Sequence, residues 1–182
     1  EYGANKIIKI TDTRLSSFDA KTYAEVIQQV AESLQVSTII LPSTADTRYL
    51  APIVAVKWGG AYLSNVSSLP KEGKVQKVIF SSKAIAWIPL APKQIITLAG
   101  NVLEAKQAPT EASIEDFSVE IPHKEKSIYS IERQKVSQKI SIEEASIVVS
   151  GGRGMQTPES WHLVEDLADA LGAATACTKP VS

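Results

Sequence analysis

Residues 145–179 read ASIVVSGGRGMQTPESWHLVEDLADALGAATACTK, and this stretch decides the fold that we expect. It opens with a short β-branched run at 147–149, which is typical of a buried parallel strand because both faces of such a strand are covered. Three glycines then interrupt the run between residues 150 and 154. They permit positive φ angles and let a ligand approach the backbone, since no Cβ atom stands in the way.

A helix should follow these glycines. Thr157 is a good N-cap and Pro158 a good first helical residue, while Gly172 is a typical helix stop. The small residues at 173–177 suit a second strand packed tightly under the helix. The unit is therefore expected to run strand, glycine loop, helix, strand. The expected buried face of the helix comprises Trp161, Val164, Leu167, Ala168 and Leu171.

The glycine loop has the features of an anion site. Backbone N–H groups and the positive end of a helix dipole point beyond the C-terminal end of the first strand. Arg153 adds a permanent cation with a planar hydrogen-bonding fork. A pyrophosphate or a reduced ring carrying negative charge fits such a site. The alternative is a tight turn whose arginine is simply solvated, and the pattern leaves both open because it is neither a Walker loop nor a full G-x-G-x-x-G.

Composition narrows the classes of protein. The 182 residues suit one large or two small domains, and 44% hydrophobic residues suffice for a core. A net charge of −1 gives no electrostatic reason to expect nucleic acid or an acidic membrane surface. No apolar run approaches the roughly 20 residues that span a bilayer, so no membrane insertion is expected. The single cysteine, Cys177, excludes an internal disulfide and is expected to be buried. His123 and His162 lack a Cys or carboxylate at ligand spacing, so no metal site is expected.

The N-terminal part alternates strands and helices. A short strand at 6–10, an amphipathic helix at 19–34 and an apolar strand at 38–41 predict an α/β domain with a doubly wound, mainly parallel, Rossmann-like sheet. Hydroxyl and carboxylate groups at 43–47 either cap the next helix or lie at a ligand-binding edge, and we assign no site there. Further along, we expect a helix at 48–58 that ends at two glycines, one or two strands within 75–88, and a strand at 94–98.

The composition changes after Ala108. Residues 109–139 are rich in Glu, Lys, Ser and Gln, with loosely alternating apolar residues, which indicates an extended strand and a linker. We therefore expect an N-terminal α/β domain at 1–108, a connecting segment at 109–140 and the start of a second α/β domain at 141–182. The chain begins without a methionine and stops just after a strand, so we expect a piece of a longer protein. Trp58 and Trp87 are expected in a core or an interface.

The motif VVSGGRG, followed by a helix ending DLADALGA and a small-residue strand, resembles the start of the flavin-binding domain in the alpha subunit of electron transfer flavoproteins. The resemblance implies that Arg153, with the backbone at Gly152, contacts FAD. It also implies that Thr178 and Lys179 occupy the place of a Ser-Arg pair that contacts the same cofactor. Lys179 departs from the family pattern: an ammonium keeps the charge but loses the planar guanidinium, which the family uses to stabilise the anionic reduced flavin.

The resemblance covers nearly the whole chain and implies an electron carrier more than an enzyme with its own substrate. Such a protein pairs with a beta subunit, holds one FAD near the subunit junction, and passes electrons from dehydrogenases such as acyl-CoA dehydrogenases to a membrane quinone oxidoreductase. It implies a role in fatty acid β-oxidation and a location in the bacterial cytoplasm or the mitochondrial matrix. The first strand and helix of the N-terminal domain, and most of the flavin domain, would then lie outside this sequence.

Two rival functions remain from the sequence. One is a nucleotide-binding regulatory module of universal-stress-like fold, in which residues 42–48 and the glycine loop hold ATP or AMP without redox chemistry. The other is a structural domain that only binds a partner. Flavin absorbance would separate the carrier from both rivals.

Overall fold

The computed structural model describes residues 2–121, 142, 145–155 and 157–179. The chain divides into two compact units, residues 1–124 and 125–182. The three-part division expected from the sequence, with boundaries at 108 and 140, stays a prediction.

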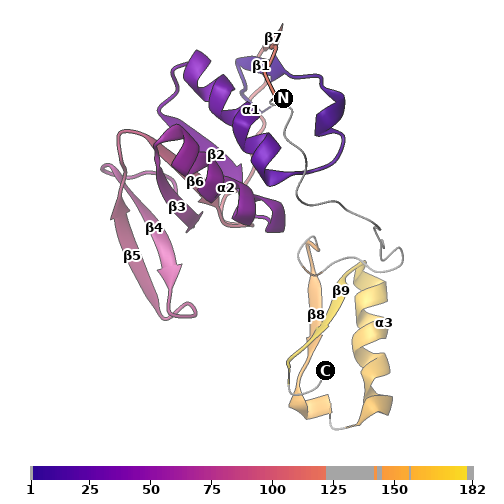
Figure 1. Cartoon of the computed structure of the whole chain (residues 1–182). Helices are drawn as coiled ribbons and strands as arrows, with labels where there is room; N and C mark the ends of the chain where they lie inside the picture. Colours follow the sequence, from indigo (N-terminus) through magenta and orange to yellow (C-terminus); the bar gives the residue numbers. More distant parts are fainter. Residues whose placement is uncertain (1, 122–141, 143–144, 156, 180–182) are drawn as a thin grey trace. The chain divides into compact units, whose positions relative to one another are not determined.

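The N-terminal unit is built on a five-stranded sheet with the order β2-β6-β3-β4-β5 (Figure 1). β2, β6 and β3 run parallel, whereas β4 and β5 form an antiparallel hairpin. The predicted α/β class is therefore confirmed, with a sheet that is mixed in direction. The strands are β2 (Thr38–Pro42), β6 (Gln94–Leu98), β3 (Ala61–Val66), β4 (Lys74–Ile79) and β5 (Ala84–Pro89).

Two helices cover this sheet, α1 (Ala20–Ser33) and α2 (Ala45–Trp58). The Asp19 side chain caps α1 by accepting a hydrogen bond from the backbone N–H of Thr22 at 2.8 Å. α2 begins three residues before the expected Arg48, because Thr44 and Thr47 form a reciprocal capping box that satisfies two N–H groups at the helix start. α2 ends at Gly59, whose φ of 73° is the left-handed conformation expected of a glycine stop.

The main core lies between the helices and the sheet. Trp58 is almost fully buried at the end of α2, and the Lys93 ammonium lies 4.4 Å from the centre of its ring and donates to its carbonyl oxygen. A smaller cluster of Val66, Val75 and Ile96 joins the hairpin to the parallel strands. The main core comprises Ala24, Ala31, Leu50, Ala51, Val54, Ala55, Trp58 and Ile95.

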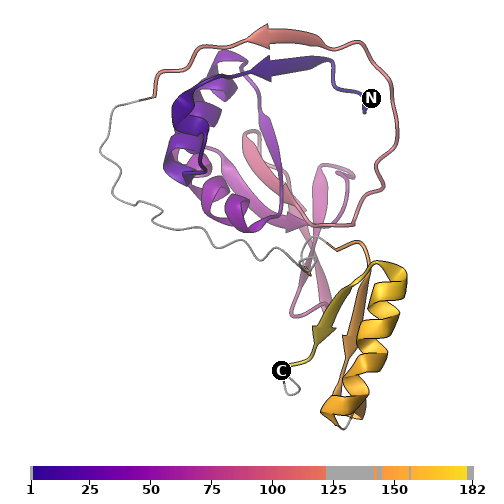
Figure 2. The same ribbon diagram turned by 90° about the vertical axis from the view of Figure 1, so that its right-hand side faces the viewer.

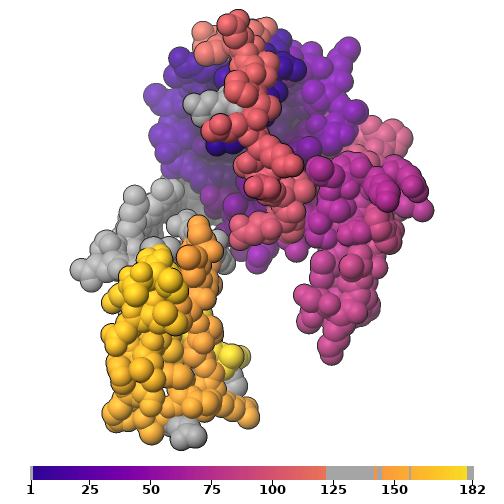
Figure 3. All heavy atoms as spheres, turned by 180° about the vertical axis from the view of Figure 1, so that it is seen from behind, coloured from indigo at the N-terminus to yellow at the C-terminus, as the bar shows by residue number. Residues whose placement is uncertain are grey.

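The first strand lies outside the five-stranded sheet. β1 (Lys6–Lys9) pairs in parallel with β7 (Ser113–Asp116), more than a hundred residues later, and an ion pair of 2.8 Å joins Lys6 to Glu115 (Figure 2). The alternation of elements predicted that this strand belongs to the main sheet. Its sequence, KIIK, offers each face only one isoleucine, which is too little apolar surface for a strand inside a covered sheet. Figure 3 shows the chain around β7 crossing the outside of the unit.

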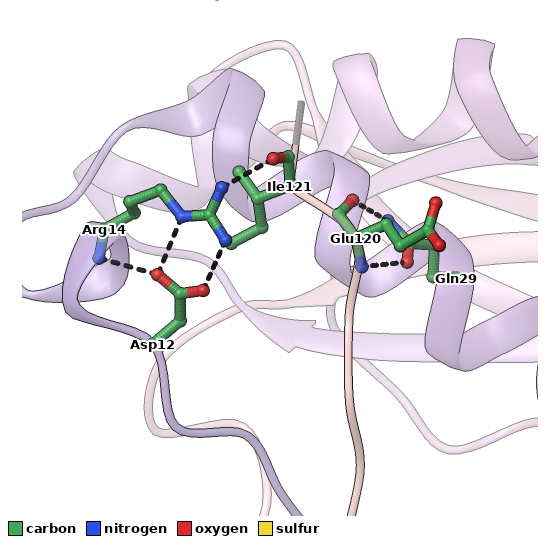
Figure 4. A network of polar contacts seen from close by, with 5 residues as sticks. All are labelled: Asp12, Arg14, Gln29, Glu120 and Ile121. Atoms are coloured by element: carbon green, nitrogen blue, oxygen red, sulfur yellow. Dashed lines mark hydrogen bonds and ion pairs between the residues drawn. The ribbon is translucent and has the colours of Figure 1, made fainter. Parts of the chain in front are cut away.

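A polar network fixes the segment that follows β7 (Figure 4). Arg14, in the 3-10 turn η1 (Thr13–Leu15), donates to both Asp12 carboxylate oxygens and, at 2.5 Å, to the carbonyl oxygen of Ile121. The side-chain amide of Gln29 on α1 exchanges two hydrogen bonds with the backbone of Glu120. The hydrogen bonds and positive charge of Arg14 lower the pKa of Asp12 to about 2. This segment is therefore held to the body of the unit.

The C-terminal unit has the predicted order of strand, glycine loop, helix and strand. Its strands β8 and β9 are parallel, and α3 packs against both. Gly172 ends α3 with a φ of 60°, as expected. The elements are β8 (Val148–Gly151), the 3-10 turns η2 (Arg153–Met155) and η3 (Pro158–Trp161), α3 (His162–Leu171) and β9 (Ala174–Cys177).

Burial in this unit differs from what the sequence predicted. Val164 and Ala168 are buried as expected, but Leu167 and Leu171 are 51% and 48% exposed. Cys177, expected inside, is exposed at the end of β9. The physical reason is that a pair of strands offers one helix a narrow surface, which covers only one line of its side chains.

Candidate functional site

The two parallel strands of the C-terminal unit bring the predicted cofactor residues to one edge. Gly151, the last residue of β8, is in register with Cys177, the last residue of β9. The N–H of Thr178 donates to the carbonyl oxygen of Gly151 at 3.4 Å, so the chain leaves both strands at the same level. Gly152 and Arg153 therefore follow one strand where Thr178 and Lys179 follow its neighbour. We call these last four residues the β8–β9 edge.

The β8–β9 edge is positively charged and open to solvent. Arg153, Thr178 and Lys179 are all exposed. Among the described residues, the Arg153 guanidinium has no hydrogen-bond or ion-pair partner. A cation held at a strand end without an acidic partner is suited to a phosphate or another anion, because neither charge of an existing pair must be given up.

The glycines of the loop have different reasons to be glycine. A Cβ atom on Gly151 would lie 2.4 Å from the ring of Trp161, so packing of that ring demands the absence of a side chain. A Cβ atom on Gly152 or Gly154 would meet nothing within 4 Å. Protein packing thus explains Gly151 but leaves free space beside the two glycines next to Arg153.

The loop does not use the positive φ angles that its glycines permit. Gly151, Gly152 and Gly154 are all outside the left-handed region. Instead the chain turns through the right-handed 3-10 turn η2, closed by a hydrogen bond of 3.0 Å from the N–H of Met155 to the carbonyl oxygen of Gly152. This right-handed turn changes the direction of the chain without a residue at positive φ.

The 3-10 turn η3 begins at Pro158, where the sequence predicted the helix to start, and the α-helix α3 begins four residues later at His162. Thr157 holds the N-cap position without capping a backbone N–H, and its hydroxyl lies 3.3 Å from that of Ser160. A bond from its own backbone N–H, together with the Thr157 hydroxyl, lowers the pKa of Glu159. His162 places Nδ1 at 2.6 Å from the carbonyl oxygen of Glu159. The side chains of Thr157 and His162 therefore make local contacts at the start of the helix.

Other candidate sites can be placed briefly. His123 lies outside the described residues, and the described part of the chain contains no group of three His, Cys, Asp or Glu side chains arranged to hold a metal ion. Within the same part, no helix is long and apolar enough to cross a membrane. The hydroxyl-rich segment 43–47, to which we assigned no site, borders a pocket that also involves Tyr62, Asn65 and Thr97. No pattern in the sequence joins these three residues to segment 43–47, because they come from β3 and β6.

Comparisons with known proteins agree on one family. Residues 1–122 match the family model of the electron transfer flavoprotein domain, and residues 141–182 match that of the electron transfer flavoprotein FAD-binding domain. The β8–β9 edge falls in the second match.

Curated relatives cover almost all of this chain. The electron transfer flavoprotein subunit alpha of Bacillus subtilis is 27% identical, over 98% of this chain and 56% of its own length. The subunit alpha of Mycobacterium leprae is 29% identical, over 97% and 56%. Subunit LctC of a lactate dehydrogenase (NAD(+),ferredoxin) from Acetobacterium woodii is 26% identical, over 99% and 45%. The chain thus spans about half the length of the curated relatives it matches.

Proposed function

Because the chain belongs to the alpha subunits of the electron transfer flavoprotein family, we propose that it holds FAD at the β8–β9 edge and carries electrons between other redox proteins. The cofactor of the matched C-terminal domain is FAD. The observation that carries the proposal is the convergence of Gly152, Arg153, Thr178 and Lys179 within that domain.

The residues at this edge fit the cofactor. Free space beside Gly152 lets an anionic group approach the backbone, and Arg153 supplies a cation with no described partner. The Thr178 hydroxyl can donate or accept a hydrogen bond. When bound, FAD supplies the redox chemistry, and the protein positions it and adjusts its electrostatics. Two cations at one edge favour the more negative form of any bound group, so Arg153 and Lys179 would set how readily the cofactor is reduced.

A lysine at 179 has a specific consequence. An ammonium is a compact point charge, whereas a guanidinium is planar and stacks on aromatic rings. Lys179 would therefore contribute charge to the bound cofactor without stacking on it. We expect Lys179→Arg to change the flavin reduction potential while leaving the amount of bound FAD similar.

We propose a beta subunit as the structural partner. The β4–β5 hairpin projects from the N-terminal unit (Figures 1 and 3). It exposes several apolar side chains. Val78 and Ile85 face each other across the strands, Trp87 lies two residues beyond Ile85, and Phe80 is at the tip. Exposed apolar surface of this kind supports a protein partner. This surface is called the hairpin surface below.

The redox partners follow from the carrier role. We propose dehydrogenases such as acyl-CoA dehydrogenases as donors, and thus a role in fatty acid β-oxidation, and a membrane quinone oxidoreductase as acceptor. The proposed location is the bacterial cytoplasm, and the bacterial curated relatives support a bacterial origin.

The test is the visible spectrum of the natural gene product, coexpressed with its beta subunit and reduced stepwise. We expect a flavin spectrum that Arg153→Met weakens. Losing one charge-assisted contact should raise the Kd for FAD about 10- to 100-fold. The matched control is Lys71→Met, which removes an exposed cation of the N-terminal unit. A folded, paired and colourless complex that fails to take up added FAD would contradict the proposal, and retained adenine nucleotide in that complex would favour a nucleotide-binding regulatory module.

A further inference from the structure

A polar pocket lies in the N-terminal unit, which is the unit without the β8–β9 edge. Its volume is about 490 Å³, within the range of pockets that hold small organic ligands. Six of the seven lining residues have hydrophilic side chains, and the seventh is a tyrosine. The lining comprises Ser43, Thr47, Arg48, Tyr62, Ser64, Asn65 and Thr97.

The fold places this pocket where open α/β sheets bind ligands. β2, β6 and β3 are parallel, and Ser43, Thr97 and Asn65 lie at or near their carboxyl ends. Ligands of such sheets bind outside the carboxyl ends of the strands. Thr47 and Arg48 come from the first turn of α2, which starts directly after β2.

A hydrogen bond to the buried Thr97 holds one wall of the pocket in place. The register of β3 against β6 shifts between Leu63 and Val66, and Asn65 in this bulge has a φ of 55°. The N–H of Asn65 donates at 2.9 Å to the hydroxyl of Thr97, which is only 2% exposed. This bond fixes the backbone at the bulge. The Asn65 amide and the Ser43 hydroxyl have no hydrogen-bond partner among the described side chains and backbone groups, so both can bind a ligand.

The pocket is also positively charged. Arg48 lines it and has no ion pair or side-chain hydrogen bond with any described residue. The Lys77 ammonium donates at 2.7 Å to the hydroxyl of Ser64, which lines the same pocket, and a neutral hydroxyl leaves that charge uncompensated. Neither Lys77 nor Asp46, the acidic residue in the first turn of α2, is among the lining residues. Arg48 in the lining and the Lys77 charge beside Ser64 favour an anionic ligand.

We propose that this pocket binds a small organic phosphate monoester, of the size of a nucleoside or sugar monophosphate. Arg48 and Lys77 bind the phosphate, as guanidinium and ammonium groups do elsewhere. The Asn65 amide and the Ser43 hydroxyl bind polar groups of the sugar or nucleoside part of the ligand. The Tyr62 side chain provides an aromatic surface for the same part. Inorganic phosphate alone would leave most of the volume unfilled. All of these residues belong to the N-terminal unit, whereas the β8–β9 edge belongs to the C-terminal unit.

The test is titration calorimetry on the natural gene product with its FAD and beta subunit. The probes are adenosine monophosphate, ribose 5-phosphate, adenosine and inorganic phosphate. We expect both monoesters to bind more tightly than inorganic phosphate, and adenosine to bind more weakly than its monophosphate. Arg48→Met and Lys77→Met should each raise the Kd for adenosine monophosphate about 10- to 100-fold. Flavin absorbance, recorded in parallel, reports the FAD site separately.

The matched control is Lys71→Met, which removes an exposed cation of the same unit that does not line the pocket. Its Kd for adenosine monophosphate should equal that of the unchanged protein. Circular dichroism checks that each variant is folded. Three results would overturn the proposal: no monoester binding by a folded protein, equal affinity for inorganic phosphate and the monoesters, or monoester binding that both Arg48→Met and Lys77→Met leave unchanged.

Discussion

The two units of this chain differ in how many of their large apolar side chains are buried. The N-terminal unit has one buried cluster between its helices and its sheet and a second where the hairpin meets the parallel strands, and residues such as Val54 and Ile95 are fully buried. The described part of the C-terminal unit buries only Val164, Ala168 and Ala174 among its hydrophobic residues. Exposed there are Ile142, Ile147, Val148, Leu163, Leu167 and Leu171.

The C-terminal unit shows that local backbone geometry can form where little apolar surface is buried. The loop, the helix stop and the paired strand ends of the C-terminal unit are in place although its apolar side chains are uncovered. Turns and parallel pairing therefore define the β8–β9 edge. A stable fold needs more burial, because a small set of elements buries too little apolar area to offset its conformational entropy.

The largest expected difference is between a core residue of the N-terminal unit and an exposed leucine of the C-terminal unit. Trp58→Ala should cost about 3–5 kcal/mol of unfolding free energy in the N-terminal unit, because it empties the centre of the core. Leu167→Ala, on the exposed side of α3, should cost less than about 1 kcal/mol. Urea unfolding followed by circular dichroism measures both. Equal costs would show that the exposed face of α3 is covered in the natural protein.

The next comparison uses neighbouring glycines of the C-terminal unit. Gly151→Ala should destabilise the unit by about 1–3 kcal/mol, because the new Cβ would clash with the Trp161 ring. Gly152→Ala should leave stability unchanged, since the methyl group meets open space, yet lower FAD affinity by occupying the approach to the backbone. Thermal unfolding and FAD titration separate the two effects. Unchanged FAD affinity in a folded Gly152→Ala protein would place the cofactor elsewhere.

Local signals in the sequence predicted most of the fold. Periodicity and caps gave the helices, and both helix stops at Gly59 and Gly172 have the expected conformation. The pairing of β1 with β7 was missed, because partners more than a hundred residues apart leave no local pattern. The predictions that Cys177 and Leu167 are buried were wrong for a related reason. Composition shows that a residue is apolar, while the surrounding elements decide whether anything covers it.

The sequence likewise predicted one part of the candidate site and not the other. Two parallel strands joined by a helix have their carboxyl ends at the same edge of the sheet. The sequence therefore predicted that Arg153 and Thr178 lie close together. It could not tell Gly151 from Gly152, because their difference depends on where the ring of Trp161 lies. The pocket beside Arg48 was also missed as a site. Its walls come from three strand ends and a helix, and the bulge at Asn65 has no glycine to mark it.

The hairpin surface is the described apolar patch of the N-terminal unit that we assign to a partner. A substitution there should affect subunit pairing and leave the stability of the unit nearly unchanged. Trp87→Ser should leave the stability of the free chain within about 0.5 kcal/mol, because this ring is 51% exposed. It should weaken pairing with the beta subunit by at least about 1 kcal/mol, since exposed aromatic residues often dominate interfaces. Equilibrium sedimentation of the mixed subunits measures the pairing. Unchanged pairing would remove this surface from the proposed interface.

The smallest expected effect concerns the polar network that fixes the segment after β7. Its Asp12 carboxyl has a folded-state pKa of about 2, against 3.8 for the ordinary group. Over this interval the unfolded chain binds more protons, so the stabilisation by Asp12 is present above pH 4 and is lost as the pH falls towards 2. Asp12→Asn should therefore lower stability slightly at pH 7 and make no difference near pH 2. A stability gap between the two proteins that persists at pH 2 would show that Asp12 acts through shape rather than charge, and that the N-terminal unit holds its last segment without an ion pair.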